Sequence, residues 1–148
     1  MKVAVQREDF DAGAEIRALS RDPKIGAVAS FVGVVREVPM TLEHYAGMTE
    51  REIANIVEEA RSRWQVLDCT VIHRYGELQP TDQIVLVVVA SGHRGDAFAA
   101  CEFVMDYLKT RAPFWKKEQT AEGERWVEAR ASDDRAAERW QGKKSDAA

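Results

Sequence analysis

Hydrophobic and polar residues recur along this chain with two different periods, which predict strands and helices in alternation. Strands are predicted at 2–6, 25–35, 40–45, 69–73 and 83–91, where β-branched or alternating apolar residues are frequent. The run from Ile84 to Ala90 is apolar throughout, which is typical of a strand covered on both faces. Pro39 ends the strand at 25–35, and a turn is expected at Gly76.

Helical spacing predicts helices between these strands. The first covers 11–20, with Asp9 or Asp11 as a candidate N-cap. The second begins at a predicted capping box formed by Thr49 and Glu52. Its buried face is expected to consist of Ile53, Ile56, Val57, Ala60 and Trp64.

A third long helix is predicted from the segment Gly92–Asp96 onward. It ends near Arg111, because Pro113 disfavours helical geometry in the preceding residue. Its core stripe is expected to consist of Phe98, Cys101, Met105 and Leu108.

The C-terminal part predicts a hairpin and a last helix. Residues 114–119 are expected to be extended, 122–124 to turn, and 125–129 to return as the hairpin partner. A helix is predicted at 132–140 and a disordered tail at 141–148. The order of elements predicts one α+β domain over residues 1–140, with helices on one face of a mixed sheet.

Composition narrows the class of protein. The 148 residues are 45% hydrophobic and 31% charged, which is typical of a globular chain and excludes a disordered one. The N-terminus has no apolar signal-peptide core, and the longest apolar run is far shorter than the roughly 20 residues of a membrane helix, so we expect a cytoplasmic protein. Cys69 and Cys101 lack metal-ligand spacing and are expected to be buried, reduced thiols.

The segment from Lys109 to Lys117 is the strongest chemical signal. It contains four cations and no acid, although the whole chain has a net charge of −4. Together with its two aromatic residues, this pattern indicates a site for an anion that also has a flat or apolar part. An alternative is that Lys109 and Arg111 only complement the negative end of the helix dipole.

Strand periodicity separates the two adjacent lysines. Side chains alternate along a strand, so Lys116 shares a face with Phe114 while Lys117 shares the other with Trp115. We therefore expect Lys116 to face the same pocket as Lys109. Lys117 is equally compatible with a solvated surface position.

Further cations stand at the ends of predicted strands. His93 and Arg94 lie where a buried strand passes into a helix, a common place for ligands and anions. The alternative is a histidine in a turn and an arginine paired with Asp96. Arg36 ends another buried strand, and His44 and His73, within strands, are interpreted as structural.

Several longer motifs resemble one known family. They are Thr41–Thr49, Val71–Arg74 with Gly76–Leu78, His93–Arg94, Met105–Glu118 and Gly123–Arg130. In these motifs the chain resembles the MoaE family, the large catalytic subunits of molybdopterin synthase, from about residue 25 to Trp140.

The resemblance implies an α/β-hammerhead domain with an additional antiparallel β subdomain. It also implies a sulfurtransferase that makes the molybdopterin dithiolene from cyclic pyranopterin monophosphate, with no permanently bound cofactor or metal. Sulfur would arrive as the C-terminal Gly-Gly thiocarboxylate of a small ubiquitin-like subunit. The implied assembly is a homodimer within a heterotetramer, without nucleic acid or membrane.

The resemblance assigns roles by position. Lys109 and Lys116 would be the catalytic pair, and Phe31 and Met105 apolar walls. Substrate-binding positions would be Val34, Val35, Arg36, His93, Arg94, Lys109, Lys116, Lys117, Glu118 and Arg130, the last from the second subunit of the homodimer. The chain departs from the family in its short loop after Arg36 and in Val34, where relatives often carry a basic residue.

Two alternatives remain at this stage. One is a non-catalytic scaffold that docks a ubiquitin-like sulfur carrier. The other is an unrelated enzyme that uses the same basic pocket for a phosphate ligand. The presence of both Lys109 and Lys116 argues against the scaffold.

Overall fold

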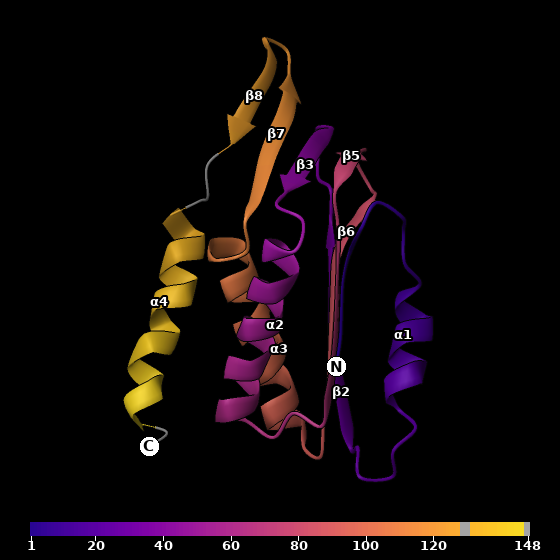
Figure 1. Cartoon of the computed structure of the whole chain (residues 1–148), viewed down its shortest axis with the longest axis vertical. Helices are drawn as coiled ribbons and strands as arrows, with labels where there is room; N and C mark the ends of the chain where they lie inside the picture. Colours follow the sequence, from indigo (N-terminus) through magenta and orange to yellow (C-terminus); the bar gives the residue numbers. More distant parts are fainter. Residues whose placement is uncertain (128–130, 147–148) are drawn as a thin grey trace.

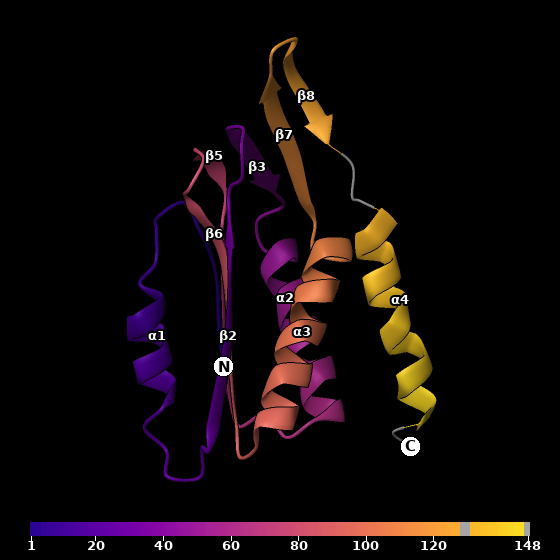
Figure 2. The same cartoon turned by 180° about the vertical axis from the view of Figure 1, so that it is seen from behind.

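A computed structural model describes residues 1–127 and 131–146, and over these residues the elements follow the predicted order with one short strand added. In Figures 1 and 2 they form layers: α1, a sheet, the pair α2 and α3, and α4 outermost. The elements are β1 (Lys2–Gln6), α1 (Ala12–Leu19), β2 (Ala27–Val34), β3 (Met40–His44), α2 (Met48–Arg63), β4 (Asp68–Arg74), β5 (Gly76–Leu78), β6 (Gln83–Ser91), α3 (Arg94–Thr110), β7 (Phe114–Thr120), β8 (Gly123–Val127) and α4 (Ala131–Asp146).

The first sheet has the strand order β1-β4-β6-β2. Strands β1 and β4 are parallel, and the other neighbours are antiparallel. The apolar strand β6 lies in the interior of the sheet, as its sequence predicts, and Val85 to Ala90 are all buried.

Helices cover both faces of this sheet, so the prediction of helices on one face is wrong. Val85, Val87 and Val89 of β6 belong to the core beneath α2 and α3. Leu86 and Val88 belong to a second core that includes Leu19 of α1. A strand with apolar residues at every position requires cover on both sides, and α1 supplies the second cover.

The second sheet has the order β5-β3-β7-β8, with antiparallel neighbours throughout. It confirms the α+β class with an additional antiparallel β subdomain. Strand β5 was not predicted, because its three residues begin at Gly76, which was interpreted as a turn. Figure 1 shows the β7–β8 hairpin projecting beyond the ends of the helices.

Helix α2 begins differently from the prediction. Its N-cap is Gly47, with φ of 84°, and the carboxylate of Glu50 accepts a hydrogen bond from the Gly47 N–H at 2.6 Å. The predicted pair of Thr49 and Glu52 is wrong: Thr49 is buried inside the helix, and Glu52 binds Arg111. The start is shifted because Gly47 tolerates a positive φ that a residue with a Cβ atom rarely adopts.

Helix α3 buries Cys101, Met105 and Leu108 as predicted, but Phe98 is 66% exposed. The helix packs against α2 and α4 as well as against the sheet. Its buried arc is therefore centred on Val104, and Phe98 lies beyond the edge of that arc. Cys69 and Cys101 are both free and buried, as expected.

Polar and aromatic contacts of Arg139 and Trp140 hold α4 against α3. The Trp140 indole N–H donates to Asp106 at 2.6 Å, and Arg139 also binds the Asp106 carboxylate. The Trp140 ring packs edge-on against Phe103 and Trp64. The helix continues to Asp146, so residues 141–146 are helical and not the start of a disordered tail; residues 147–148 lie outside the described part of the chain.

Candidate active site

A cavity of about 630 Å³ opens where the two sheets meet the C-terminal end of α3. This volume lies within the roughly 300–1,000 Å³ usual for small-molecule sites. Its apolar wall includes Phe31, Met40, Leu42, Met105, Leu108 and Phe114. Its charged lining, over the described residues, consists of Arg36, Glu37, Lys109, Lys116, Glu118 and Asp133. Cations and carboxylates are thus mixed in one apolar recess.

Strand β7 presents one set of alternate side chains to this cavity. Phe114, Lys116 and Glu118 all line it. The Lys116 ammonium lies 3.0 Å from the Glu118 carboxylate, and the two side chains are 33% and 19% exposed. Because both groups are partly removed from water, Glu118 can hold the Lys116 ammonium in place at the cavity wall.

Lys117 lies on the other face of β7. Its ammonium is 4.6 Å from the centre of the Trp126 ring and 3.4 Å from the Glu124 carboxylate. It is not among the residues that line the cavity. The prediction that Lys116, and not Lys117, shares a cavity with Lys109 is therefore confirmed as geometry.

Lys109 enters the cavity from the last turn of α3. The helix ends as predicted before Pro113, with the Arg111 N–H donating to the Tyr107 carbonyl at 2.8 Å. Met105 and Leu108 of the same helix end are buried in the core, which fixes the direction of this turn. The partial negative charge of the helix end favours the ammonium there, so the dipole interpretation and a site role are compatible.

Arg111 has a structural role through ion pairs, which differs from the helix-dipole role that one alternative from the sequence gave it. Its guanidinium binds the carboxylates of Glu52, at 2.5 Å, and Glu59. It also lies 5.3 Å from the centre of the Tyr107 ring. These contacts hold α2 against the end of α3 and leave Lys109 as the cation of this turn that lines the cavity.

The end of β2 forms the opposite wall. Val35 is buried and exchanges backbone hydrogen bonds with the loop before β6, whereas Val34 is 49% exposed. The Val38 N–H donates to the Arg36 carbonyl at 2.9 Å across Glu37, which has φ of 72°. This tight three-residue turn is how the short loop places Arg36 on the cavity wall.

Comparisons with known proteins identify the family of this chain. The model of the family described as MoaE protein matches residues 5–111. The molybdopterin synthase catalytic subunit of Ralstonia nicotianae is 63% identical, covering 93% of this chain and 83% of that protein. The chain belongs to the MoaE family. It is accordingly a molybdopterin synthase catalytic subunit, a sulfurtransferase of molybdenum cofactor biosynthesis, as the motifs predict.

Solved structures agree with this assignment. The molybdopterin biosynthesis MoaE protein from Burkholderia ambifaria has a TM-score of 0.83 and 58% identity, covering 95% of this chain and 98% of that one. A complex of subunits 1 and 2 of molybdopterin-converting factor from Helicobacter pylori contains a chain with a TM-score of 0.72 and 18% identity, covering 86% and 91%. The second likeness shows a shared fold.

Most positions carried over from the MoaE resemblance meet at the cavity. They are Phe31, Val34, Val35, Arg36, Met105, Lys109, Lys116 and Glu118. Lys117 faces away, and Arg130 lies outside the described residues. Residues from three separate segments of the sequence thus converge on one recess.

His93 and Arg94 are not brought to this recess. Both are exposed at the N-terminal end of α3, whereas Lys109 is at its C-terminal end. At 1.5 Å per residue, the fifteen residues from Arg94 to Lys109 span roughly 22 Å. The carboxylate of Asp96 accepts a hydrogen bond from the Gln65 N–H at 3.0 Å. Within one chain, His93 and Arg94 are therefore too far away to line the cavity of Lys109.

Three ionisable residues that line the cavity were missed from the sequence: Glu37, His73 and Asp133. His73 was interpreted as structural because it lies within a strand. Its burial lowers the pKa of its imidazole to about 4, and the charges of Lys109 and His44 act in the same direction. The available signal was its position near the end of β4, where a side chain can reach the junction of the two sheets.

Among the described residues, no group of three or more His, Cys, Asp or Glu side chains could hold a metal ion. In the same part of the chain, no helix is long and apolar enough to cross a membrane.

Proposed function

We propose that this MoaE-family subunit converts cyclic pyranopterin monophosphate to the molybdopterin dithiolene in the cavity between Lys109 and Lys116. The observation that carries the proposal is the convergence of these two lysines, from different elements, on one recess with Arg36. A planar pterin with a cyclic phosphate requires both apolar surface and cations. The recess offers Phe31 and Met105 for the first and the three cations for the second.

The residues have distinct roles in this proposal. Arg36 binds the phosphate, because a guanidinium can make two parallel hydrogen bonds to its oxygens. Lys109 and Lys116 stabilise negative charge that develops as sulfur adds and the cyclic phosphate opens, and they exchange protons with the reacting groups. Glu118 keeps the Lys116 ammonium oriented through their 3.0 Å contact.

The sulfur donor in this proposal is a small ubiquitin-like subunit with a C-terminal Gly-Gly thiocarboxylate. A glycine tail is narrow enough to enter the recess beside the exposed side chains of Phe31 and Val34. The fold shared with a chain of the two-subunit Helicobacter pylori complex is consistent with such a partner. Cys69 and Cys101 are buried in the core and are not needed as sulfur carriers.

The roles proposed for His93 and Arg94 require a second protomer. Their separation from Lys109 along α3 prevents them from contacting the same substrate within one chain. In a homodimer, the N-terminal end of one α3 can approach the cavity of the partner. We therefore propose a homodimer within a heterotetramer, with Arg130 contributed in the same way. A cytoplasmic location stays a prediction.

The direct test is turnover with defined components. Purified protein is mixed with thiocarboxylated carrier and cyclic pyranopterin monophosphate, and the dithiolene product is detected after derivatisation. We expect product to form in proportion to the thiocarboxylate added. Binding of the carrier without product would instead support the non-catalytic scaffold, and activity on an unrelated phosphate ester alone would support the second alternative.

A further inference from the structure

His73 is the residue of the cavity whose chemistry is least explained by the proposed roles. It is half-buried on β4, and it lines the same cavity as Lys109. Three independent contacts fix its ring, its tautomer and its backbone, and together they define which atom it can offer to the cavity.

The ring plane is set by Phe114. The two rings are stacked with centroids 3.8 Å apart and an interplanar angle of 21°. Phe114 is the first residue of β7, two positions before Lys116 and on the same face. The imidazole is thus clamped between its own strand and the strand that carries Lys116, and it cannot rotate freely.

The tautomer is set by a backbone carbonyl. The His73 Nδ1 lies 2.8 Å from the Arg74 carbonyl oxygen. A carbonyl oxygen only accepts hydrogen bonds, so Nδ1 must carry the proton. In the neutral imidazole, Nε2 then has no proton and presents a lone pair.

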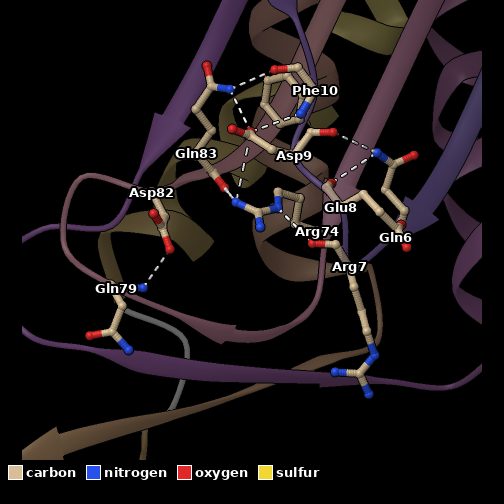
Figure 3. A network of polar contacts seen from close by, with 9 residues as sticks. All are labelled: Gln6, Arg7, Glu8, Asp9, Phe10, Arg74, Gln79, Asp82 and Gln83. Carbon is tan, nitrogen blue, oxygen red and sulfur yellow. Dashed lines mark hydrogen bonds and ion pairs between the residues drawn. The ribbon is translucent and has the colours of Figure 1, made fainter.

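A polar network around the Arg74 side chain holds the backbone at this residue in place (Figure 3). The Arg74 side chain donates to the carbonyl oxygens of Arg7, at 3.0 Å, and Gln83, at 2.9 Å. The Asp9 carboxylate is 3.9 Å from the same guanidinium and accepts a hydrogen bond from the Gln83 side chain at 2.8 Å. The network joins the end of β4 to β6 and to the loop after β1. The carbonyl that sets the tautomer of His73 is therefore firmly placed.

Lys109 is the cation for which the Nε2 lone pair of His73 is available as a hydrogen-bond acceptor. Lys109 and His73 line the same cavity, and the charge of Lys109 disfavours the protonated form of the imidazole. The Lys116 ammonium is oriented by its 3.0 Å contact with Glu118. A neutral acceptor beside Lys109 can orient the ammonium without neutralising its charge, which a carboxylate would do.

We propose that His73 is a positioning residue for Lys109, and that its Nε2 lone pair accepts a hydrogen bond from the Lys109 ammonium and aims it at the substrate. The inference rests on the catalytic role proposed for Lys109. It adds a residue to the site that family membership and sequence motifs left as structural.

Two substitutions distinguish the contribution of the Nε2 lone pair from that of the aromatic ring. His73→Phe keeps a ring that can stack on Phe114 but removes the acceptor, whereas His73→Gln loses the ring and keeps an oxygen acceptor near the Nε2 position. We expect His73→Phe to lower kcat at least about 10-fold with KM changed less than about threefold, and His73→Gln to stay within about fivefold of wild type. The pH profile of kcat should shift in His73→Phe, because the environment of the lysine changes.

His44→Gln is the matched control. His44 also contacts Phe114, with ring centroids 6.2 Å apart, but it is not among the residues that line the cavity. Its substitution should leave the pH profile unchanged. The proposal is overturned if His73→Phe turns over like wild type, or if His73→Gln loses as much kcat as His73→Phe.

A spectroscopic measurement keeps the test independent of turnover. In ¹⁵N NMR at neutral pH, His73 should show a protonated Nδ1 and an unprotonated Nε2, and Lys109→Met should move the Nε2 resonance while leaving Nδ1 in place. A protonated Nε2, or an Nε2 signal insensitive to Lys109→Met, contradicts the inference even if the enzyme is active. Conversely, full activity of Lys109→Met contradicts the catalytic role and not the hydrogen bond.

Discussion

At the scale of single residues, adjacent lysines on β7 should differ sharply in function because they lie on opposite faces. We expect Lys116→Ala to lower kcat by about 100-fold or more, the usual contribution of a positioned proton donor, while binding of the carrier subunit stays near normal. Lys117→Ala should change kcat by less than about threefold, because its ammonium contacts Trp126 and Glu124 outside the cavity. Steady-state assays with thiocarboxylated carrier measure both. Equal losses in the two variants would contradict the assignment by strand face.

His73 also predicts how stability depends on pH. Its pKa is lowered by burial from 6.5 to about 4, so below pH 6.5 the unfolded chain binds a proton that the folded protein excludes. Stability is therefore complete above pH 6.5, falls as pH decreases toward 4 by at most about 3 kcal/mol, and loses nothing further below that pH through this group.

Urea denaturation at pH 7, 5.5 and 4.5 checks this slope, with His73→Gln as the comparison. The variant should be less sensitive to pH across the same window. Asp9 does not interfere with this measurement. The hydrogen bond from Gln83 lowers the pKa of Asp9, so the contribution of Asp9 to stability is lost only as pH falls below the usual aspartate pKa of 3.8. Identical slopes in wild type and His73→Gln would show that the imidazole is readily protonated in the folded state.

At the scale of elements, two glycines near helix N-termini should respond oppositely to the same substitution. Gly47, the N-cap of α2, has φ of 84°, so a Cβ atom there is strained despite open space. Gly95 lies in the first turn of α3, and an added Cβ would meet no atom within 4 Å. We expect Gly47→Ala to destabilise the protein by about 1 kcal/mol and Gly95→Ala to stabilise it by roughly 0.5–1 kcal/mol. Chemical denaturation measures both, and shifts of the same sign would refute the role of φ.

Periodicity within one element explains which parts of the fold could be predicted. The alternation along β7 gave the correct face for Lys116, and the continuous apolar run of β6 gave its interior position, because a strand's period depends only on local geometry. The prediction that Phe98 is buried was wrong because the buried arc of α3 depends on α4, a separate helix that begins only at Ala131. The capping prediction for Thr49 was wrong because Gly47 provides an earlier N-cap, and the sequence pattern does not reveal its positive φ.

At the scale of the whole molecule, the residues of the site could likewise be predicted only where local geometry brings them together. Lys109 and Lys116 are close in sequence, so the helix end and the strand between them fix their convergence. His73 enters the cavity only because β4 and β7 belong to different sheets that meet there, which spacing along the chain does not encode. His93 and Arg94 were expected at the same pocket, yet the length of α3 separates them from it. Their role depends on assembly, and it can be tested at that level.

Subunit complementation tests whether the site is shared between protomers. In a symmetric dimer with shared sites, a mixed dimer of Lys116→Ala and Arg94→Ala chains has one site with both changes and one site with neither. If the two chains associate at random in equal amounts, about one quarter of all sites are intact, so about one quarter of wild-type activity should return.

Each variant alone should have little activity, and co-expression with two affinity tags allows the mixed dimer to be purified. Lys116→Ala paired with Lys109→Ala is the matched control: both lysines line the cavity of one chain, so each site of a mixed dimer lacks one lysine and no site is intact. Recovery in the Arg94 pair and none in the lysine pair is the expected result. The activity of the lysine pair provides the baseline, because it does not depend on whether Arg94 is shared between protomers. Absence of recovery in the Arg94 pair would contradict a site shared between protomers. Because roughly 22 Å along α3 separates Arg94 from the cavity of its own chain, that result would assign Arg94 to the dimer contact itself.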